Sequence, residues 1–141
     1  MRLWHYKLIP VLPNAMLVSQ WRECIAIKRQ WEKGTLKHRL VSYVMDYDKK
    51  YFFNYTCNVI IELSRRNIKY NEKLLKEIAE FCIKNENEVI ESNFCYYIEH
   101  NDRYLKQCYY NLQEKADRGI ITKEEWKLIH KNIYGLFKEE I

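Results

Sequence analysis

Residues 1–33 read MRLWHYKLIPVLPNAMLVSQWRECIAIKRQWEK, and the rest of the chain is organised around this stretch. Its first part is apolar, and Pro10 and Pro13 bias the residues before them away from helical backbone angles. The chain up to Pro13 is therefore predicted to be extended or irregular. A helical run that carries Arg22 and Glu23 follows. This order predicts that the terminal amine belongs to a site beside the helix.

The first long helix is predicted to run from Asn14 to about Lys33. Asparagine is a favoured N-cap residue, because its side chain accepts a hydrogen bond from the free amides of the first turn. Gly34 is predicted to follow the C-cap, where glycine adopts the left-handed conformation at least cost. Apolar side chains spaced by three and four residues form the predicted buried stripe: Leu17, Val18, Trp21, Cys24 and Ile25.

The rest of the chain shows mainly helical periodicity. Helices are predicted over residues 47–66, 71–84, from 93 or 101 to 118, and from the capping box at Thr122 onward. Residues 35–45 fit either a short strand or irregular chain that lines the core, and the charged residues 85–92 are predicted to form a loop. The sequence thus predicts an all-α fold. We expect a single domain over residues 1–141, with four to five helices and the N-terminal segment packed on the first long helix.

Composition argues against several classes of protein. The chain of 141 residues has only 3 Gly and 2 Pro, too few for an all-β domain or a glycine-rich phosphate loop. No apolar run reaches the ~18 residues of a membrane span, and the prolines interrupt any signal peptide. No CxxC pair occurs, so reduced thiols in a cytoplasmic protein are expected instead of disulfides or a zinc site. The cysteines are Cys24, Cys57, Cys82, Cys95 and Cys108.

The charge balance is moderately basic, with a formal net charge of +5 and a pI near 8.9. Such a balance favours a polyanionic partner through counterion release. The chain also has 12 tyrosines and 4 tryptophans, whose faces can stack on unpaired bases. Most of these aromatic side chains are nevertheless expected in the core. Charge and aromatic content together favour nucleic acid without requiring it.

The N-terminal residues suggest amine chemistry. An α-amine has a pKa of about 7.7–8.0, well below the ~10.4 of lysine, so part of it is neutral at physiological pH. A neutral amine can attack a sugar carbon and hold the product as a Schiff base. It then needs a carboxylate to manage protons, and Glu23 supplies one if the first residues fold back along the helix. The small side chains of Ser19 and Ala26 on the same helix face leave room beside it. The competing interpretation is that Arg22 and Glu23 are ordinary solvent-exposed residues.

The segments MRLWHYKLIPVLP and LVSQWREC, with the later pair Lys37-His38, resemble the pyrimidine dimer DNA glycosylase family. The resemblance implies a small all-α protein whose terminal α-amine is the nucleophile and which cuts the strand by β-elimination. It also implies a catalytic glutamate after an arginine on the first helix, which matches Arg22-Glu23. Because Arg2 is too large for removal of the initiator to be expected, Met1 is predicted to supply the amine.

The resemblance further implies a DNA-binding surface. Weaker similarity continues in Leu112-Gln113-Glu114-Lys115, where the family lysine meets DNA. The expected partner is double-stranded DNA with a damaged or abasic site, bound by a monomer that uses no metal, cofactor or membrane. The residues predicted to bind DNA are Arg2, His5, Arg22, Lys37, His38 and Lys115.

Two other functions stay open at this point. One is a non-catalytic DNA-binding protein on the same scaffold, and the other is a helical protein–protein interaction module. His5 fits either a phosphate contact or a polar surface. His100 and His130, on later helices, are expected at the surface.

Overall fold

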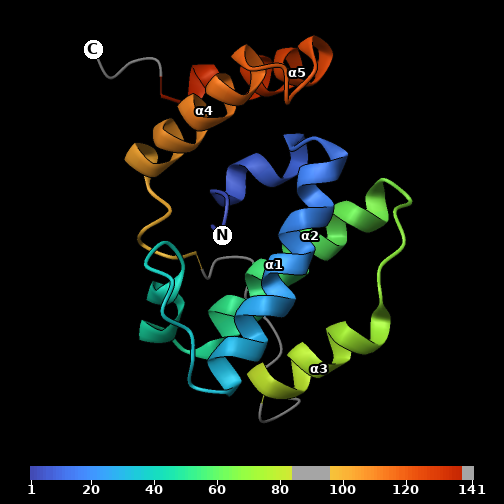
Figure 1. Cartoon of the computed structure of the whole chain (residues 1–141), viewed down its shortest axis with the longest axis vertical. Helices are drawn as coiled ribbons and strands as arrows, with labels where there is room; N and C mark the ends of the chain where they lie inside the picture. Colours follow the sequence, from blue (N-terminus) through green and yellow to red (C-terminus); the bar gives the residue numbers. More distant parts are fainter. Residues whose placement is uncertain (84–95, 138–141) are drawn as a thin grey trace.

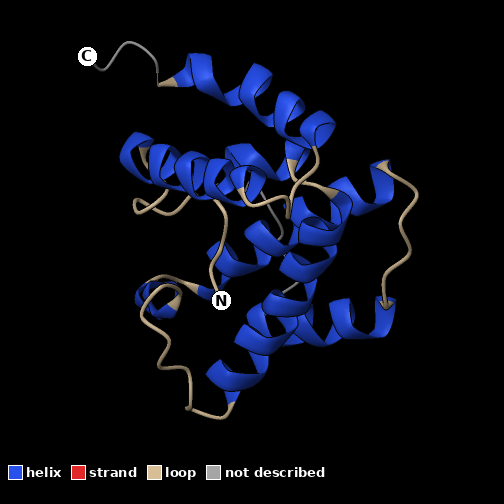
Figure 2. Cartoon of the chain, turned by 45° about the horizontal axis from the view of Figure 1, so that its top comes forward, coloured by secondary structure: helices blue, strands red, loops and turns tan. Residues whose placement is uncertain are grey.

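The computed structural model describes residues 1–83 and 96–137, and every regular element within these ranges is a helix (Figure 2). The α-helices are α1 (Asn14–Glu32), α2 (Lys49–Arg65), α3 (Glu72–Cys82), α4 (Asp102–Asp117) and α5 (Lys123–Ile133). The 3-10 helices are η1 (Tyr6–Val11), η2 (Ser42–Asp46) and η5 (Tyr134–Leu136). The prediction of an all-α fold is confirmed. The loop predicted at 85–92 and the earlier helix start at 93 lie outside the described residues.

The helices form two groups with the N-terminal segment between them (Figure 1). Helices α1, α2 and α3 pack against one another, and α4 packs on α5. Because η1 contacts both α2 and α5, it links the two groups. A cluster of buried apolar side chains runs through both, including Leu3, Leu17, Val59, Leu112 and Ile129. The first residues of the chain are therefore part of the core, and the N-terminus lies beside the middle of α1.

Helix α1 closely follows the predicted boundaries. Its last turn ends in a Schellman motif, in which Gly34 has a φ of 71° and Thr35 N–H donates to Gln30 O at 2.8 Å. The start differs by one residue, because Pro13 is the N-cap and Asn14 is the first helical residue. Asn14 was predicted to cap the helix, but its side-chain oxygen instead accepts a hydrogen bond from Arg66.

The N-terminal segment is only partly extended, so the prediction for residues up to Pro13 was wrong over Tyr6–Val11. A 3-10 helix needs only i→i+3 hydrogen bonds, and the first is donated by Leu8 N–H to His5 O at 2.8 Å. Arg66, at the end of α2, donates to the carbonyl oxygens of Ile9, Pro10 and Leu12. Tertiary contacts of this kind stabilise a turn that the local sequence does not favour.

Other predicted elements agree with the structure within a few residues. Helices α2 and α3 lie inside the ranges predicted for them, and α4 begins after the N-cap Asn101, the later of the two predicted starts. The capping box at Thr122 is formed, with Glu125 N–H donating to Thr122 Oγ1 at 3.1 Å. Residues 42–46 form η2 instead of a strand, with Val44 buried.

Two further findings concern the cysteines and the helices of the described residues. Four cysteines are free thiols, namely Cys24, Cys57, Cys82 and Cys108, whereas Cys95 lies outside the described residues. Within residues 1–83 and 96–137, none of the helices combines the length and the apolar character that crossing a membrane requires.

Candidate active site

Polar side chains from three different helices hold the backbone of the N-terminal segment. From α2, the hydroxyl of Tyr55 donates to Trp4 O at 2.5 Å, and from α4 the hydroxyl of Tyr104 donates to Leu3 O at 2.6 Å. Leu3 and Trp4 are themselves buried. Hydrogen bonds from α2 and α4 therefore fix the backbone at Leu3 and Trp4, two to three residues after the terminal amine.

The third side chain is Gln20 on α1, which contacts the segment at two points. Its Nε2 donates to Arg2 O at 3.0 Å, and its Oε1 accepts the N–H of Trp4 at 2.8 Å. The same Nε2 donates to Glu23 Oε2 at 3.0 Å. Gln20 thus joins the N-terminal segment directly to the predicted catalytic carboxylate.

Glu23 is half-buried on α1, and its environment acts on the pKa in both directions. Burial is the largest effect, and it raises the pKa of Glu23 above its ordinary value. The positive charge of the α-amine at Met1 and a hydrogen bond from the Arg2 N–H lower the pKa in part. The amine and the carboxylate are therefore close enough to interact electrostatically, as the fold-back of the first residues requires.

Arg2 lies against the same group of residues. Its guanidinium is 5.2 Å from the centre of the Trp4 ring, and its Nη1 is 4.0 Å from Cys108 Sγ on α4. The charge of Arg2 also lowers the pKa of Glu23. The side chain is half-buried, so part of it remains accessible to a ligand at the site.

The other predicted DNA contacts lie on the surface or close to it. Arg22 is exposed on α1 directly before Glu23. Lys37 and His38 are exposed in the stretch that follows α1, where His38 Nδ1 accepts the N–H of Leu40 at 3.3 Å. Lys115 is half-buried in the last turn of α4. The first three are side chains that a large anionic ligand can reach.

His5 differs from its prediction, because the side chain is only 1% exposed. Neither a phosphate contact nor a polar surface position fits a side chain that is this buried. His5 instead caps η1, and its Nδ1 accepts the N–H of Lys7 at 3.1 Å. Burial, with a smaller effect from the charge of Lys7, lowers the pKa of His5 to about 4.

The surface position predicted for His100 was also wrong, while His130 is exposed as expected. His100 Nδ1 accepts the N–H of Tyr6 at 3.3 Å, so Nε2 carries the proton and donates to the hydroxyl of Tyr43 at 2.7 Å. Burial, followed by the charge of His5, lowers the pKa of His100 to about 3. Both histidines therefore fix the start of η1 in their neutral forms.

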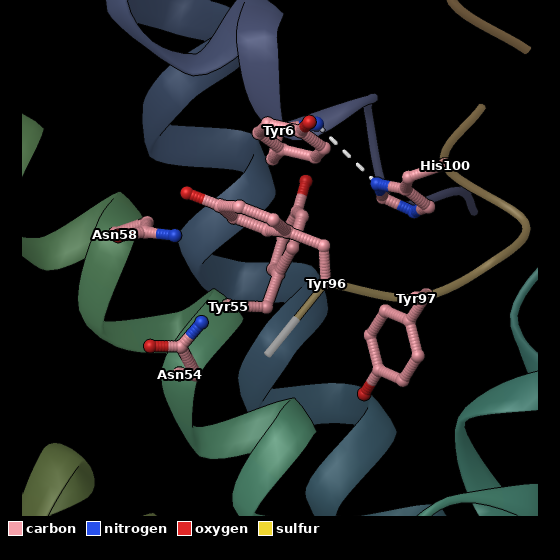
Figure 3. A pocket seen from close by; sticks show the side chains of 7 residues that line it. All are labelled: Tyr6, Asn54, Tyr55, Asn58, Tyr96, Tyr97 and His100. Atoms are coloured by element: carbon pink, nitrogen blue, oxygen red, sulfur yellow. Dashed lines mark hydrogen bonds between the residues drawn. The ribbon is translucent and has the colours of Figure 1, made fainter. Parts of the chain in front are cut away.

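A pocket of about 320 Å³ lies between η1 and α2. Tyr6 and Tyr96 line it and stack with ring centroids 3.8 Å apart, an arrangement that Figure 3 shows from the adjoining smaller hollow near His100. Neither Met1 nor Glu23 lines either space. The amine and the carboxylate therefore belong to a separate site, on the side of the N-terminal segment that faces α1.

The sequence did not identify Gln20, Tyr55 or Tyr104. A signal existed for Gln20, because it lies three residues after Leu17 and four before Cys24, within the apolar stripe of α1. A polar residue at such a position must find buried partners. Nothing local distinguishes Tyr55 and Tyr104, since tyrosines at buried helix positions are common and their hydrogen bonds here reach residues 51 and 101 positions away.

The site unites a nucleophile, a carboxylate and a cation. A primary amine beside a half-buried carboxylate of raised pKa is suited to imine chemistry, in which protons must be taken up and released near neutral pH. Among residues 1–83 and 96–137, no group of three or more His, Cys, Asp or Glu side chains is arranged to hold a metal ion.

Comparison with known proteins identifies one family. Its model, described as pyrimidine dimer DNA glycosylase, matches residues 1–77, which include Met1, Arg22 and Glu23. No curated protein and no solved structure matches the sequence. The matched region covers more than half of the chain and includes the N-terminal segment, α1, α2 and the first part of α3. The chain therefore belongs to the pyrimidine dimer DNA glycosylase family.

Proposed function

We propose that this protein is a DNA glycosylase and abasic-site lyase that uses the α-amine of Met1 as nucleophile and Glu23 as catalytic carboxylate. The main support is the electrostatic interaction between the amine and Glu23 in a partly buried site. The family match adds pyrimidine dimers in DNA as the substrate class. Closely related base lesions and abasic sites belong to the same proposal, because in each case the amine reacts at the sugar carbon C1′.

The proposed reaction begins at C1′ of the deoxyribose. The lone pair of the neutral amine attacks C1′, and the glycosidic bond breaks as the base leaves with the electron pair. The C1′–O4′ bond of the sugar ring then opens, its electron pair passes to O4′, and the iminium forms. At an abasic site the amine condenses with the aldehyde and water leaves. The resulting iminium acidifies the protons at C2′, and the Glu23 carboxylate takes one of them. The C3′–O bond then breaks and the phosphate leaves with the electron pair. Hydrolysis of the imine returns the free amine.

Access to C1′ requires a distorted duplex, because the sugar carbon is shielded in an intact stack. We propose that Arg22, Lys37 and His38 bind phosphates around the lesion, with Lys115 as a further contact, since cations on phosphates fix the position of a protein on DNA. Arg2, held against Trp4 and Cys108, is proposed to meet the phosphate nearest the reacting sugar.

Borohydride trapping on a duplex with one abasic site tests the proposal. Untagged protein is expected to give a covalent adduct, and protein whose N-terminal amine is acetylated is expected to give none while keeping its circular dichroism spectrum. Adduct formation by the acetylated protein would overturn the role of the α-amine. DNA binding without an adduct from the untagged protein would favour the non-catalytic alternative.

The role of Glu23 and the substrate need separate measurements. Glu23→Gln is compared with Glu32→Gln, the same change at an exposed glutamate of the same helix. Only the first is expected to abolish strand cleavage. A duplex with one cyclobutane pyrimidine dimer is expected to be cut, and the undamaged duplex of the same sequence is not. Cleavage of abasic DNA alone would restrict the function to the lyase step.

A further inference from the structure

Gln20 is a polar residue in the buried stripe of α1, and it is 1% exposed. Its side chain has no unused hydrogen-bonding group in this position. Oε1 accepts from Trp4 N–H at 2.8 Å and from the Tyr55 hydroxyl at 3.0 Å. Nε2 donates to Arg2 O and to Glu23 Oε2, both at 3.0 Å. A buried amide with all its groups engaged is rigid, because any rotation breaks several bonds at once.

The orientation of this amide is fixed by its partners. The N–H of Trp4 can only donate and the carbonyl of Arg2 can only accept. A flipped amide would point its NH2 group at the N–H of Trp4 and its oxygen at the carbonyl oxygen of Arg2. Donor would then face donor, and acceptor would face acceptor. The Nε2 atom must therefore point to both Arg2 O and the carboxylate of Glu23.

We infer that Gln20 is a positioning residue that holds the N-terminal segment and the Glu23 carboxylate as one unit, and thereby sets the relation between the nucleophile and its proton acceptor. The inference rests on the proposed function for its catalytic meaning. Gln20 touches neither the amine nor DNA in this role; it acts through the backbone of residues 2–4 and through Glu23. Figure 3 shows the partner Tyr55 rising from α2, with its hydroxyl directed toward the N-terminal segment.

Gln20 also acts on the protonation of Glu23. Burial disfavours the carboxylate, and the hydrogen bond from Gln20 is one of the interactions that favour it. Removal of this bond is therefore expected to raise the pKa of Glu23 further. A purely structural side chain would not have this effect, because its loss would change stability without moving the titration of a single carboxyl.

Three variants separate these roles. Gln20→Met keeps the length of the side chain and removes all four bonds. Gln20→Glu keeps the oxygen that accepts from Trp4 and Tyr55 but cannot donate to Glu23 when ionised. Gln107→Met makes the same change as the first variant at an exposed position of α4 and is the matched control.

Two measurements are made on the full-length protein. Carbon-13 NMR of the Glu23 carboxyl gives its pKa without DNA, and single-turnover cleavage of abasic DNA gives the rate as a function of pH. Gln20→Met is expected to raise the pKa of Glu23, to move the acid limb of the rate profile to higher pH by the same amount, and to lower the rate on the plateau about tenfold because the amine is misplaced. Gln107→Met is expected to match the wild type in both.

The result that would overturn the inference is a folded Gln20→Met protein in which the Glu23 titration and the acid limb are unchanged. If Gln20→Met does not fold, Gln20→Glu decides, since it keeps half of the contacts and is expected to raise the pKa of Glu23 even more through like-charge repulsion. A wild type that gives no adduct with abasic DNA would refute the proposed function. The NMR titration would still decide whether Gln20 couples to Glu23.

Discussion

Glu23 and Glu62 lie on the neighbouring helices α1 and α2, and their surroundings shift the pKa of the carboxyl in opposite directions. Glu62 on α2 is buried, yet hydrogen bonds from Arg65 and Arg66 outweigh the effect of burial and lower its pKa. Glu23 on α1 is half-buried and meets an amide, a backbone N–H and more distant cations, so burial prevails and its pKa is raised. The effect of burial on the carboxylate is thus fully offset at Glu62 and only partly offset at Glu23.

The difference separates a structural carboxylate from a reactive one. Glu62 orients Arg66, whose guanidinium also donates to carbonyl oxygens of the η1 region, so its charge is used in folding. Glu23 has no guanidinium bonded to it among the hydrogen bonds and ion pairs of the described residues, and it keeps acceptor capacity for a substrate proton. Incomplete compensation costs stability, which is common at functional sites.

The largest expected effect comes from removing the charge of Glu23. Glu23→Gln is expected to slow cleavage of abasic DNA by at least about 100-fold, the usual size of a general acid–base contribution. Because the folded-state pKa of Glu23 is raised, folding favours its neutral form, and the ionised form at pH 7 lowers the free energy of unfolding. The melting temperature of the variant should therefore equal or exceed that of the wild type. If Glu23→Gln cleaves normally, or is clearly less stable than the wild type, Glu23 is not a reactive carboxylate distinct from the structural carboxylate of Glu62.

Glu62→Gln is expected to give the opposite result. The variant leaves two guanidinium groups without their carboxylate, so the free energy of unfolding should fall by about 1–3 kcal/mol, measured in urea. Cleavage of abasic DNA per folded molecule should stay within about threefold of the wild type. Loss of cleavage in a folded Glu62→Gln protein would show that this carboxylate also belongs to the machinery.

Acid should destabilise the protein through the two buried histidines. Their pKa values in the folded state are about 4 for His5 and about 3 for His100, below the ordinary 6.5. The stability due to the neutral forms is complete above pH 6.5 and is lost as the pH falls toward these values. Each histidine contributes a slope of at most about 1.4 kcal/mol per pH unit.

Urea unfolding between pH 7 and pH 5 checks this slope. His5→Asn is the informative variant, since asparagine can still cap η1 but does not titrate. Its stability should depend less on pH over this range than that of the wild type. An equal dependence would mean that His5 is not one of the groups responsible.

The smallest effects are expected from single surface cations. Lys37→Gln should weaken DNA binding severalfold and reduce the slope of log affinity against log salt by about 1, as the loss of one phosphate contact does. Arg65→Gln is the matched control, because that exposed cation is already bonded to Glu62. Equal salt slopes for both variants and the wild type would exclude Lys37 from the DNA-binding surface.

Much of the fold was predictable from local signals. Gly34 predicts where α1 ends, and the capping box at Thr122 predicts where α5 begins. At both places the side chains and backbone of nearby residues decide the structure. The 3-10 turn of η1 was not predictable, because Arg66 stabilises it from about 55 residues away. The burial of His100 was not predictable either, because its partners Tyr6 and Tyr43 are also far away in the sequence.

The predicted pair Met1 and Glu23 came from residue types and from the resemblance, not from periodicity. The sequence could suggest which groups react, but it could not show what holds them. Gln20 is one turn from Glu23 and could have been noticed, whereas Tyr104 is tied to Leu3 only by the tertiary fold.

The contacts that hold residues 2 and 3 against α4 have a consequence for biosynthesis. The hydrogen bond from Tyr104 to Leu3 and the contact between Cys108 and Arg2 join residues 101 and 106 positions apart. The ribosome makes the amine and Glu23 before it makes α4. We therefore expect a nascent chain that ends before α4 to hold both reacting groups without their fixed geometry. Under the proposed function, lyase activity is gained only after α4 has been made and has packed on residues 2 and 3.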